Sequence, residues 1–224
     1  MLFQKPIIAI NLKTYQQGLG ENAVTIAKAI EEINPNNNAK YTAILCPQAI
    51  DIRLVCSQTK IPVFAQHGDA YDFGRNTGCV LIKSLKQAGI KGLIINHNEH
   101  KLLLSTIEKT IKLAREEKLY SICCADTVDQ AKAISCFNPD YVAVEPPELI
   151  GTDISIAKKD PKIIKEIIKK INFINPVVRV LIGAGIKTRK DIDVCIEFGA
   201  NGVLLASGVV CSKKISDVLF DFFA

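Results

Sequence analysis

Several polar side chains of this sequence stand directly after short apolar runs, and their chemical types suit proton transfer. They are Asn11 and Lys13 after the first run, Asn96, His97 and Glu99 after the fourth, and Glu145 after the sixth. Glu145 closes the apolar residues 142–144, so burial would partly desolvate its carboxylate and strengthen it as a base towards carbon acids. An acid, an imidazole and an amine at one site need neither a metal nor an organic cofactor for such chemistry.

Each of these residues also has an ordinary structural interpretation. A lysine near a strand end is usually a solvated cation, a lone histidine is usually a satisfied structural group, and a glutamate can cap a backbone. The functional interpretation is favoured because all of them follow their apolar runs at the same end. Independent structural accidents would not arrange them so.

Small residues follow the seventh and eighth runs, as Gly183-Ala184-Gly185 and Ala206-Ser207-Gly208. Backbone N–H groups at Gly185, Ala206 and Ser207 can point at an oxyanion, and the N-terminus of a following helix adds its dipole. Bulky side chains would hold the anion away from these amides. The two turns therefore predict a phosphate site.

The segment 145–152 reads Glu-Pro-Pro-Glu-Leu-Ile-Gly-Thr. Two prolines stiffen its start beside the candidate base, and Gly151 allows its tip to bring backbone close to a ligand. This pattern predicts a hinged lid that excludes water when it closes. A merely long turn between a strand and a helix is the alternative.

Eight short runs rich in Ile, Val, Leu and Ala must position these groups. They span residues 6–11, 41–46, 61–65, 92–96, 120–124, 141–145, 178–183 and 202–206. Their apolar residues are consecutive rather than alternating, which is typical of parallel strands buried on both faces. Amphipathic stretches lie between them, at 23–33, at 105–118, from an N-cap and first-turn proline at Asp160-Pro161, and at 188–198 before Gly199.

Eight strand–helix units in 224 residues favour a (β/α)8 (TIM) barrel, with residues 1–224 as one catalytic domain. A doubly wound sheet would call for a GxGxxG turn after the first strand. Asn11-Leu12-Lys13-Thr14 is unlike that turn. We therefore expect the barrel, with the chemistry at the carboxyl ends of its strands.

The charge distribution argues against a nucleic-acid partner, although the net charge is +5. Lysines between residues 158 and 170 interleave with isoleucines, as on the solvated face of a helix. No apolar run approaches the roughly 20 residues of a membrane span. The apolar stretch at residues 7–10 is too short for a signal-peptide core, so we expect a cytoplasmic protein.

Eight cysteines occur without a CxxC pair and without a histidine at metal-ligand spacing. Zinc is therefore not expected. In a cytoplasmic chain of this size, we expect the cysteines to be reduced, buried thiols that pack as small apolar side chains.

At the residues described above, the sequence closely resembles the triosephosphate isomerase family, especially its compact archaeal form. The similar blocks are residues 11–15, 96–99, 143–152, 183–186 and 202–208. They occur in family order and cover essentially the whole chain, and the block at 143–152 is the most specific. The resemblance implies interconversion of dihydroxyacetone phosphate and glyceraldehyde 3-phosphate, without a cofactor.

The resemblance also implies a role for each candidate residue. Glu145 is the base, His97 polarises the carbonyl as a neutral imidazole, and Lys13 supplies positive charge to the enediolate and the phosphate. Glu99 supports these groups. The implied substrate-binding groups are Asn11, Lys13 and the amides of Ile150 or Gly151, Gly185, Ala206 and Ser207.

Three positions depart from the family's pattern. Asp153 stands where archaeal relatives usually have glycine, just past the lid, which can stiffen its returning arm. Asn98 and His100 replace the more typical serine and arginine around Glu99. These changes leave the core histidine and glutamate intact and alter the residues around them.

Residues 66–78 look like the long loop that the family uses between subunits, so we expect a homo-oligomer, either a dimer or a tetramer. The tip of this loop, near Asn76 and Thr77, would then support Asn11 and Lys13 of the partner.

Two other functions compete with this interpretation. A phosphosugar or phosphoribosyl barrel enzyme of amino-acid biosynthesis would share the phosphate turns but place acids after the first and fifth strands. A non-catalytic barrel, which senses a phosphate ligand or associates with RNA, would not need both Glu145 and its lid.

Overall fold

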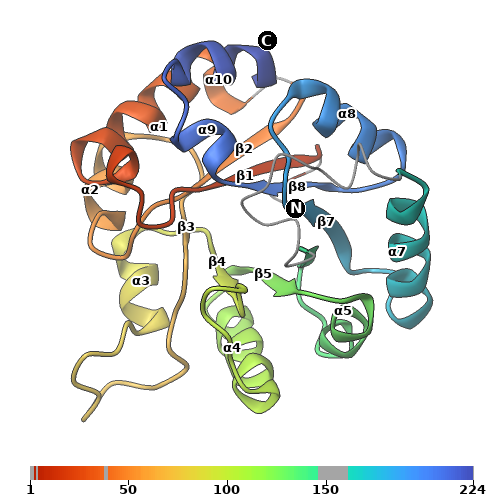
Figure 1. Cartoon of the computed structure of the whole chain (residues 1–224). Helices are drawn as coiled ribbons and strands as arrows, with labels where there is room; N and C mark the ends of the chain where they lie inside the picture. Colours follow the sequence, from red (N-terminus) through yellow and green to blue (C-terminus); the bar gives the residue numbers. More distant parts are fainter. Residues whose placement is uncertain (1–2, 4, 38–39, 146–160, 224) are drawn as a thin grey trace.

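The computed structural model describes residues 3, 5–37, 40–145 and 161–223, and its strands form one parallel sheet (Figure 1). The strands are β1 (Ile7–Asn11), β2 (Thr42–Cys46), β3 (Phe64–Ala65), β4 (Gly92–Ile95), β5 (Tyr120–Ala125), β6 (Tyr141–Val144), β7 (Arg179–Gly183) and β8 (Gly202–Leu205). Their order is β2-β1-β8-β7-β6-β5-β4-β3. An isolated parallel bridge between Leu45 of β2 and Val63, directly before β3, brings the two outer strands together and nearly closes the ring. The predicted (β/α)8 barrel is therefore confirmed.

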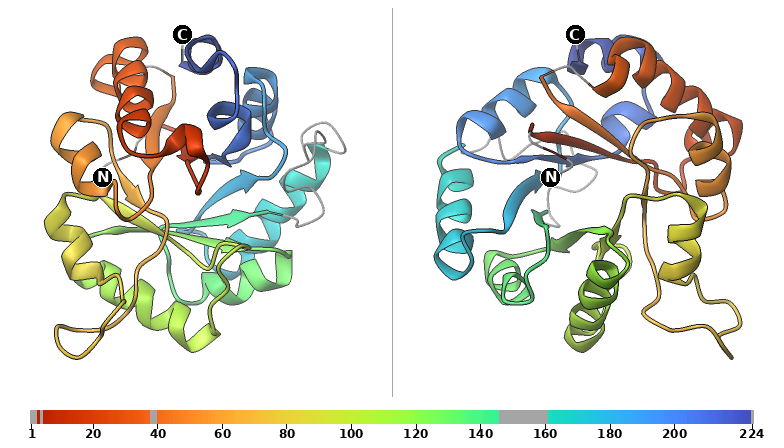
Figure 2. Two further views of the ribbon diagram at one scale, coloured as in Figure 1. Left: turned by 60° about the vertical axis from the view of Figure 1, so that its left-hand side comes forward. Right: turned by 180° about the vertical axis from the view of Figure 1, so that it is seen from behind.

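Helices surround the strands, as Figures 1 and 2 show from three directions. They are α1 (Glu21–Ile33), α2 (Ile52–Gln58), α3 (Ile82–Ala88), α4 (Leu104–Glu116), α5 (Val128–Ser135), α7 (Pro161–Ile174), α8 (Arg189–Glu197), α9 (Ser207–Val210) and α10 (Ile215–Phe223). Short 3₁₀ turns occur at Gln16–Gly18 and Pro35–Asn37.

Local signals explain most helix ends. Thr188 caps α8 in a capping box with Asp191, and Gly199 follows the helix at φ 100°. The stretch expected at 105–118 forms α4, but it stops at Glu116 because Lys118 adopts a left-handed φ of 56°. The expected N-cap at Asp160 lies outside the described residues.

The third strand is shorter than predicted. The apolar run at 61–65 contributes only Phe64–Ala65 as a regular strand. Pro62 has no N–H to donate, and its carbonyl accepts one bond from Leu45 at 3.1 Å. The seam of the barrel is therefore held by few ladder hydrogen bonds.

Side chains alternate along each strand between the barrel interior and the helix layer. The interior cluster includes Ile7, Ala9, Ile44, Cys46, Phe64, Ile94, Ile122, Cys124, Tyr141, Ala143, Leu181 and Leu204. Continuing this alternation by one step puts Asn11, Glu145 and Gly183 on the inner side at the carboxyl ends of β1, β6 and β7. After β4 the left-handed φ of Asn96 interrupts the alternation, and Asn96 lines a cavity with residues of α4 and α5. The core therefore determines which polar residues face the mouth of the barrel.

All eight cysteines are free thiols, but they are not uniformly buried. The expected burial is confirmed for Cys46, Cys123, Cys124 and Cys195. Burial raises the pKa of Cys195 to about 12. The expectation is wrong for Cys136 and Cys211, which are exposed where α5 and α9 end. Among the described helices, none is long and apolar enough to cross a membrane.

Candidate active site

A cavity of about 270 Å³ lies at the carboxyl ends of the strands and brings together the described residues that the sequence singled out. Its lining includes Asn11, Lys13, His97, Glu99, Glu145, Gly185, Ala206 and Ser207. Tyr15 and Lys187 line it as well and were not anticipated. Ile150, Gly151 and Asp153, together with the expected lid, lie outside the described residues.

Glu145 is a buried carboxylate that faces the cavity. Its side-chain atom Oε2 is fully buried and has no hydrogen-bond partner within the described part of the chain. Burial raises the pKa of Glu145 to about 7, although a hydrogen bond from the Cys124 thiol and the charge of Lys13 oppose the rise. An acceptor that is buried and unpaired in this way is available to take a proton from a bound molecule.

Gly183 makes room for this carboxylate. A Cβ atom at residue 183 would lie 2.3 Å from Glu145 Cγ and 2.5 Å from its Oε1. Any larger residue would have to displace the glutamate. The first glycine of the turn after β7 therefore serves the base, in addition to any role in binding an anion.

His97 presents Nε2 to Glu145, with 3.6 Å between this nitrogen and Oε2. Its other ring nitrogen, Nδ1, accepts the N–H of Glu99 at 3.1 Å, which assigns the hydrogen of the neutral ring to Nε2. Burial, and next the positive charge of Lys13, lower the pKa of His97 to about 4. At neutral pH this imidazole is therefore an uncharged hydrogen-bond donor aimed into the cavity.

Lys13 is held by its neighbours on both backbone and side chain. Lys13 has a left-handed φ of 46°, and its backbone N–H donates to Asn11 Oδ1 at 2.9 Å. Its ammonium group pairs with Glu99 Oε1 at 2.6 Å. The side chain of Gln66 donates to the Lys13 carbonyl at 3.0 Å and to the Cys46 carbonyl at 2.9 Å. The amine is therefore placed on a defined turn rather than on a free loop.

The turns after β7 and β8 also line the cavity. Ala184 and Gly185 both have positive φ, 68° and 70° respectively, which turns the backbone sharply after the strand. Ala206 precedes the short helix α9. A Cβ at Gly208 would lie 3.0 Å from the Ile186 carbonyl, so the two turns pack closely together.

Sequence reasoning missed the supporting roles of Gln66, Cys124 and Gly183. Gln66 was assigned only to the expected intersubunit loop, and Cys124 only to the expected buried thiols. Each acts on a residue far away along the chain, so no local pattern marks it. The resemblance of their sequence blocks to a known family was the one available signal.

Two of the positions that depart from the family's pattern, Asn98 and His100, lie in the described part of the chain, and neither lines the cavity. Asn98 donates to Asp126 at 3.1 Å. His100 stacks on His67, with 4.0 Å between ring centroids. Residues 66–78 extend away from the body of the molecule (Figure 1), and they expose Tyr71 (50%) and Phe73 (62%).

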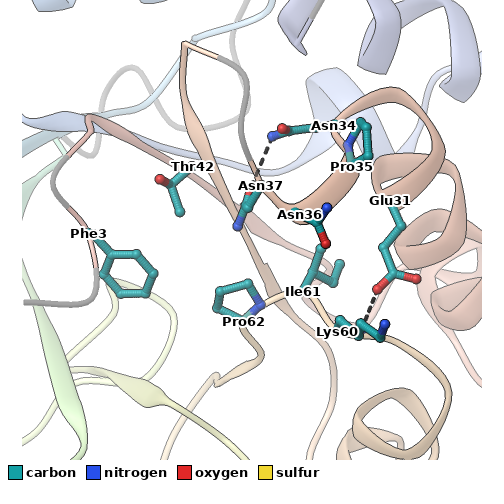
Figure 3. A pocket seen from close by; sticks show the side chains of 10 residues that line it. All are labelled: Phe3, Glu31, Asn34, Pro35, Asn36, Asn37, Thr42, Lys60, Ile61 and Pro62. Atoms are coloured by element: carbon teal, nitrogen blue, oxygen red, sulfur yellow. Dashed lines mark hydrogen bonds between the residues drawn. The ribbon is translucent and has the colours of Figure 1, made fainter.

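A larger cavity of about 590 Å³ lies at the amino ends of the strands (Figure 3). Its amides are already engaged in holding α1 against β2, since Asn37 bonds to both the N–H and the carbonyl of Ala43. The Glu31 carboxylate accepts the N–H of Lys60. This cavity therefore lacks the opposed acid and imidazole of the smaller one.

The sequence is similar to those of known proteins over almost its whole length. A family model described as triosephosphate isomerase matches residues 6–220. The triosephosphate isomerase of Methanothermus fervidus is 43% identical over 93% of each chain. Those of Methanobrevibacter smithii and Methanocaldococcus jannaschii are 41% and 39% identical, over at least 95% of each chain. The chain therefore belongs to the triosephosphate isomerase family.

Proposed function

We propose that this protein interconverts dihydroxyacetone phosphate and D-glyceraldehyde 3-phosphate by proton transfer through an enediolate. The observation that carries the proposal is the opposed pair at the mouth of the barrel. Glu145 is buried, with a raised pKa, and lies 3.6 Å from the Nε2 atom of a neutral His97. A base and an uncharged donor so close together can act on neighbouring atoms of one small substrate.

Glu145 takes the proton from C1 of dihydroxyacetone phosphate, and the electrons of the broken C–H bond form the C1–C2 double bond. The charge that develops on the C2 oxygen is met by the Nε2–H of His97 and by the ammonium group of Lys13. His97 then moves the hydroxyl proton from O1 to O2, and Glu145 returns its proton to C2, which yields the aldehyde. This division of labour is the one established for triosephosphate isomerases.

The remaining residues bind and support. The amides of Gly185, Ala206 and Ser207 hold the phosphate, and the amide of Ile150 or Gly151, which lie outside the described residues, is proposed as a further donor. Asn11 and Lys13 position the substrate, and Glu99 orients Lys13 through their ion pair. The support for the phosphate site is that these turns line the same cavity as Glu145 and His97.

We further propose that residues 1–224 form one catalytic domain and that the protein is a homo-oligomer, a dimer or a tetramer. The exposed aromatic side chains of Tyr71 and Phe73 support an interface along residues 66–78. The cytoplasm is the proposed compartment, since free thiols suit a reducing environment. The proposed reaction requires neither a nucleic acid nor a metal as a partner of the protein.

A coupled assay on the purified protein with glyceraldehyde 3-phosphate, run in the presence of EDTA, tests the activity. We expect turnover without added metal. Absence of turnover, with retained binding of inorganic phosphate, would instead favour the non-catalytic phosphate-binding barrel.

A further inference from the structure

Asn96 lies between β4 and His97 and is constrained in both backbone and side chain. Its φ of 61° falls in the left-handed region, which favours glycine and is tolerated by asparagine. The residue is 6% exposed, and both ends of its amide are hydrogen-bonded to backbone. A buried amide that is satisfied in this way fixes the segments that it joins.

The first hydrogen bond closes the loop that carries the imidazole. Asn96 Oδ1 accepts the N–H of Leu102 at 2.9 Å, so residues 97–101 form a closed turn. Inside this turn, the N–H of His100 donates to the His97 carbonyl at 2.8 Å. The Asn96 side chain therefore fixes the backbone turn that carries His97.

The second hydrogen bond ties this turn to the strand that contacts the base. Asn96 Nδ2 donates to the Cys124 carbonyl on β5 at 3.0 Å. The thiol of the same cysteine donates to Glu145. Cys124 therefore contacts both catalytic candidates. Its backbone carbonyl binds the loop that carries His97, and its thiol binds the carboxylate of Glu145.

We propose that Asn96 is a positioning residue that fixes His97 Nε2 relative to Glu145 Oε2 across β5. The inference rests on the proposed function, because it concerns two groups that act on one substrate. A displacement of about 1 Å in a reacting geometry can lower a rate by about 100-fold. Loss of the amide should therefore reduce kcat and leave KM nearly unchanged, since the described hydrogen bonds of the Asn96 side chain go to Cys124 and Leu102 rather than to the turns after β7 and β8.

The test is Asn96→Gly, which accepts the left-handed backbone and removes both side-chain bonds. Asn138→Gly is the matched control, because Asn138 also has a left-handed φ of 56° and its Oδ1 accepts a bond from Asn175 at 2.6 Å. Asn138 is exposed and precedes β6 at the opposite end of the barrel. We expect kcat to fall by about 10- to 100-fold in Asn96→Gly and to stay near the wild-type value in Asn138→Gly.

A second variant separates positioning from folding. Asn96→Asp keeps an oxygen for the Leu102 N–H but places another oxygen against the Cys124 carbonyl, so it breaks only the tether to β5. We expect its kcat to fall as well, while its thermal unfolding shows a folded protein. If Asn96→Gly does not fold, the kcat of the folded Asn96→Asp variant decides whether Asn96 is a positioning residue.

The ring of His97 gives a readout that a purely structural role would not move. Nitrogen NMR of the wild type should show the proton on Nε2 and no titration until about pH 4. In Asn96→Gly, a loosened loop admits water, and the titration should move up towards 6.5. A kcat equal to that of Asn138→Gly, together with an unchanged His97 titration, would overturn the inference. If the wild type lacks isomerase activity, the proposed function fails, and the NMR comparison still decides the role of Asn96.

Discussion

Replacing Glu145 with glutamine should abolish most activity and, at neutral pH, stabilise the fold. Burial raises the pKa of Glu145 from 4.5 to about 7. A folded-state pKa above the unfolded value means that the folded protein holds this proton more tightly. Ionisation of the carboxylate therefore lowers the free energy of unfolding as the pH rises.

The size of this effect follows from the two pKa values. At about 1.4 kcal/mol for each pKa unit, a rise from 4.5 to about 7 corresponds to about 3 kcal/mol. The loss of stability is absent below about pH 4.5, where both states are protonated. It grows as the unfolded chain loses its proton and is complete above about pH 7. Glutamine stays neutral throughout, so Glu145→Gln should escape the loss.

Urea unfolding of wild type and Glu145→Gln at pH 5, 6, 7 and 8 measures this difference. We expect the advantage of the variant to increase by about 2 kcal/mol between pH 5 and pH 8. Glu108→Gln, at an exposed position on α4, corrects for removal of one negative charge. A difference that is flat with pH, or no larger than in Glu108→Gln, would refute the argument that burial tunes this carboxylate.

The same variant tests the chemistry. Positioned bases contribute about 10²–10⁴-fold, so turnover should fall by at least about a thousandfold, which is roughly 4 kcal/mol of barrier. Binding of a phosphate-bearing substrate analogue should weaken far less. Exchange of the substrate's carbon-bound hydrogen with solvent deuterium at the wild-type rate would show that another residue takes the proton.

Three further predictions concern the same cavity. Gly183→Ala places a Cβ 2.3 Å from Glu145 Cγ, so turnover should drop at least about tenfold while circular dichroism stays unchanged. The kcat/KM of the wild type should rise with pH through about 7 as Glu145 loses its proton, whereas a profile that is flat from pH 5.5 to 8.5 would contradict the assignment. Gly185→Val should raise KM strongly, because residue 185 has φ 70° and lines the cavity at the turn proposed to bind phosphate, and wild-type affinity in that variant would exclude this turn from the site.

The fold could be predicted from the sequence because its strands are buried on both faces. Consecutive apolar residues in eight runs leave little choice but a parallel sheet covered by helices. The position of Glu145 could be predicted for a related reason. It ends an apolar run, and it lies two residues after Ala143, so it faces the same inner side of the barrel. The extent of β3 was less predictable, because one proline in an apolar run removes a ladder donor.

The contacts between strands could not be predicted in the same way. That Asn96 reaches Cys124 depends on the register of β4 against β5, and that Gly183 meets Glu145 depends on the register of β7 against β6. A single sequence shows the apolar character of each strand but not which residues stand side by side. Sequence reasoning therefore found the residues that line one cavity but not the contacts that hold them there.

The seam between β2 and β3 has a consequence for how the barrel opens. In the described part of the chain, one bridge joins these strands, at Leu45 and Val63, whereas β1 and β2 pair along five residues. Local unfolding needs the fewest broken hydrogen bonds at such a seam. Gln66 spans it by binding the carbonyls of Cys46 and Lys13. A transient opening there would release the turn of Lys13 while the rest of the ring stays folded, so the cavity can lose the positive charge of Lys13 in a fluctuation much smaller than denaturation.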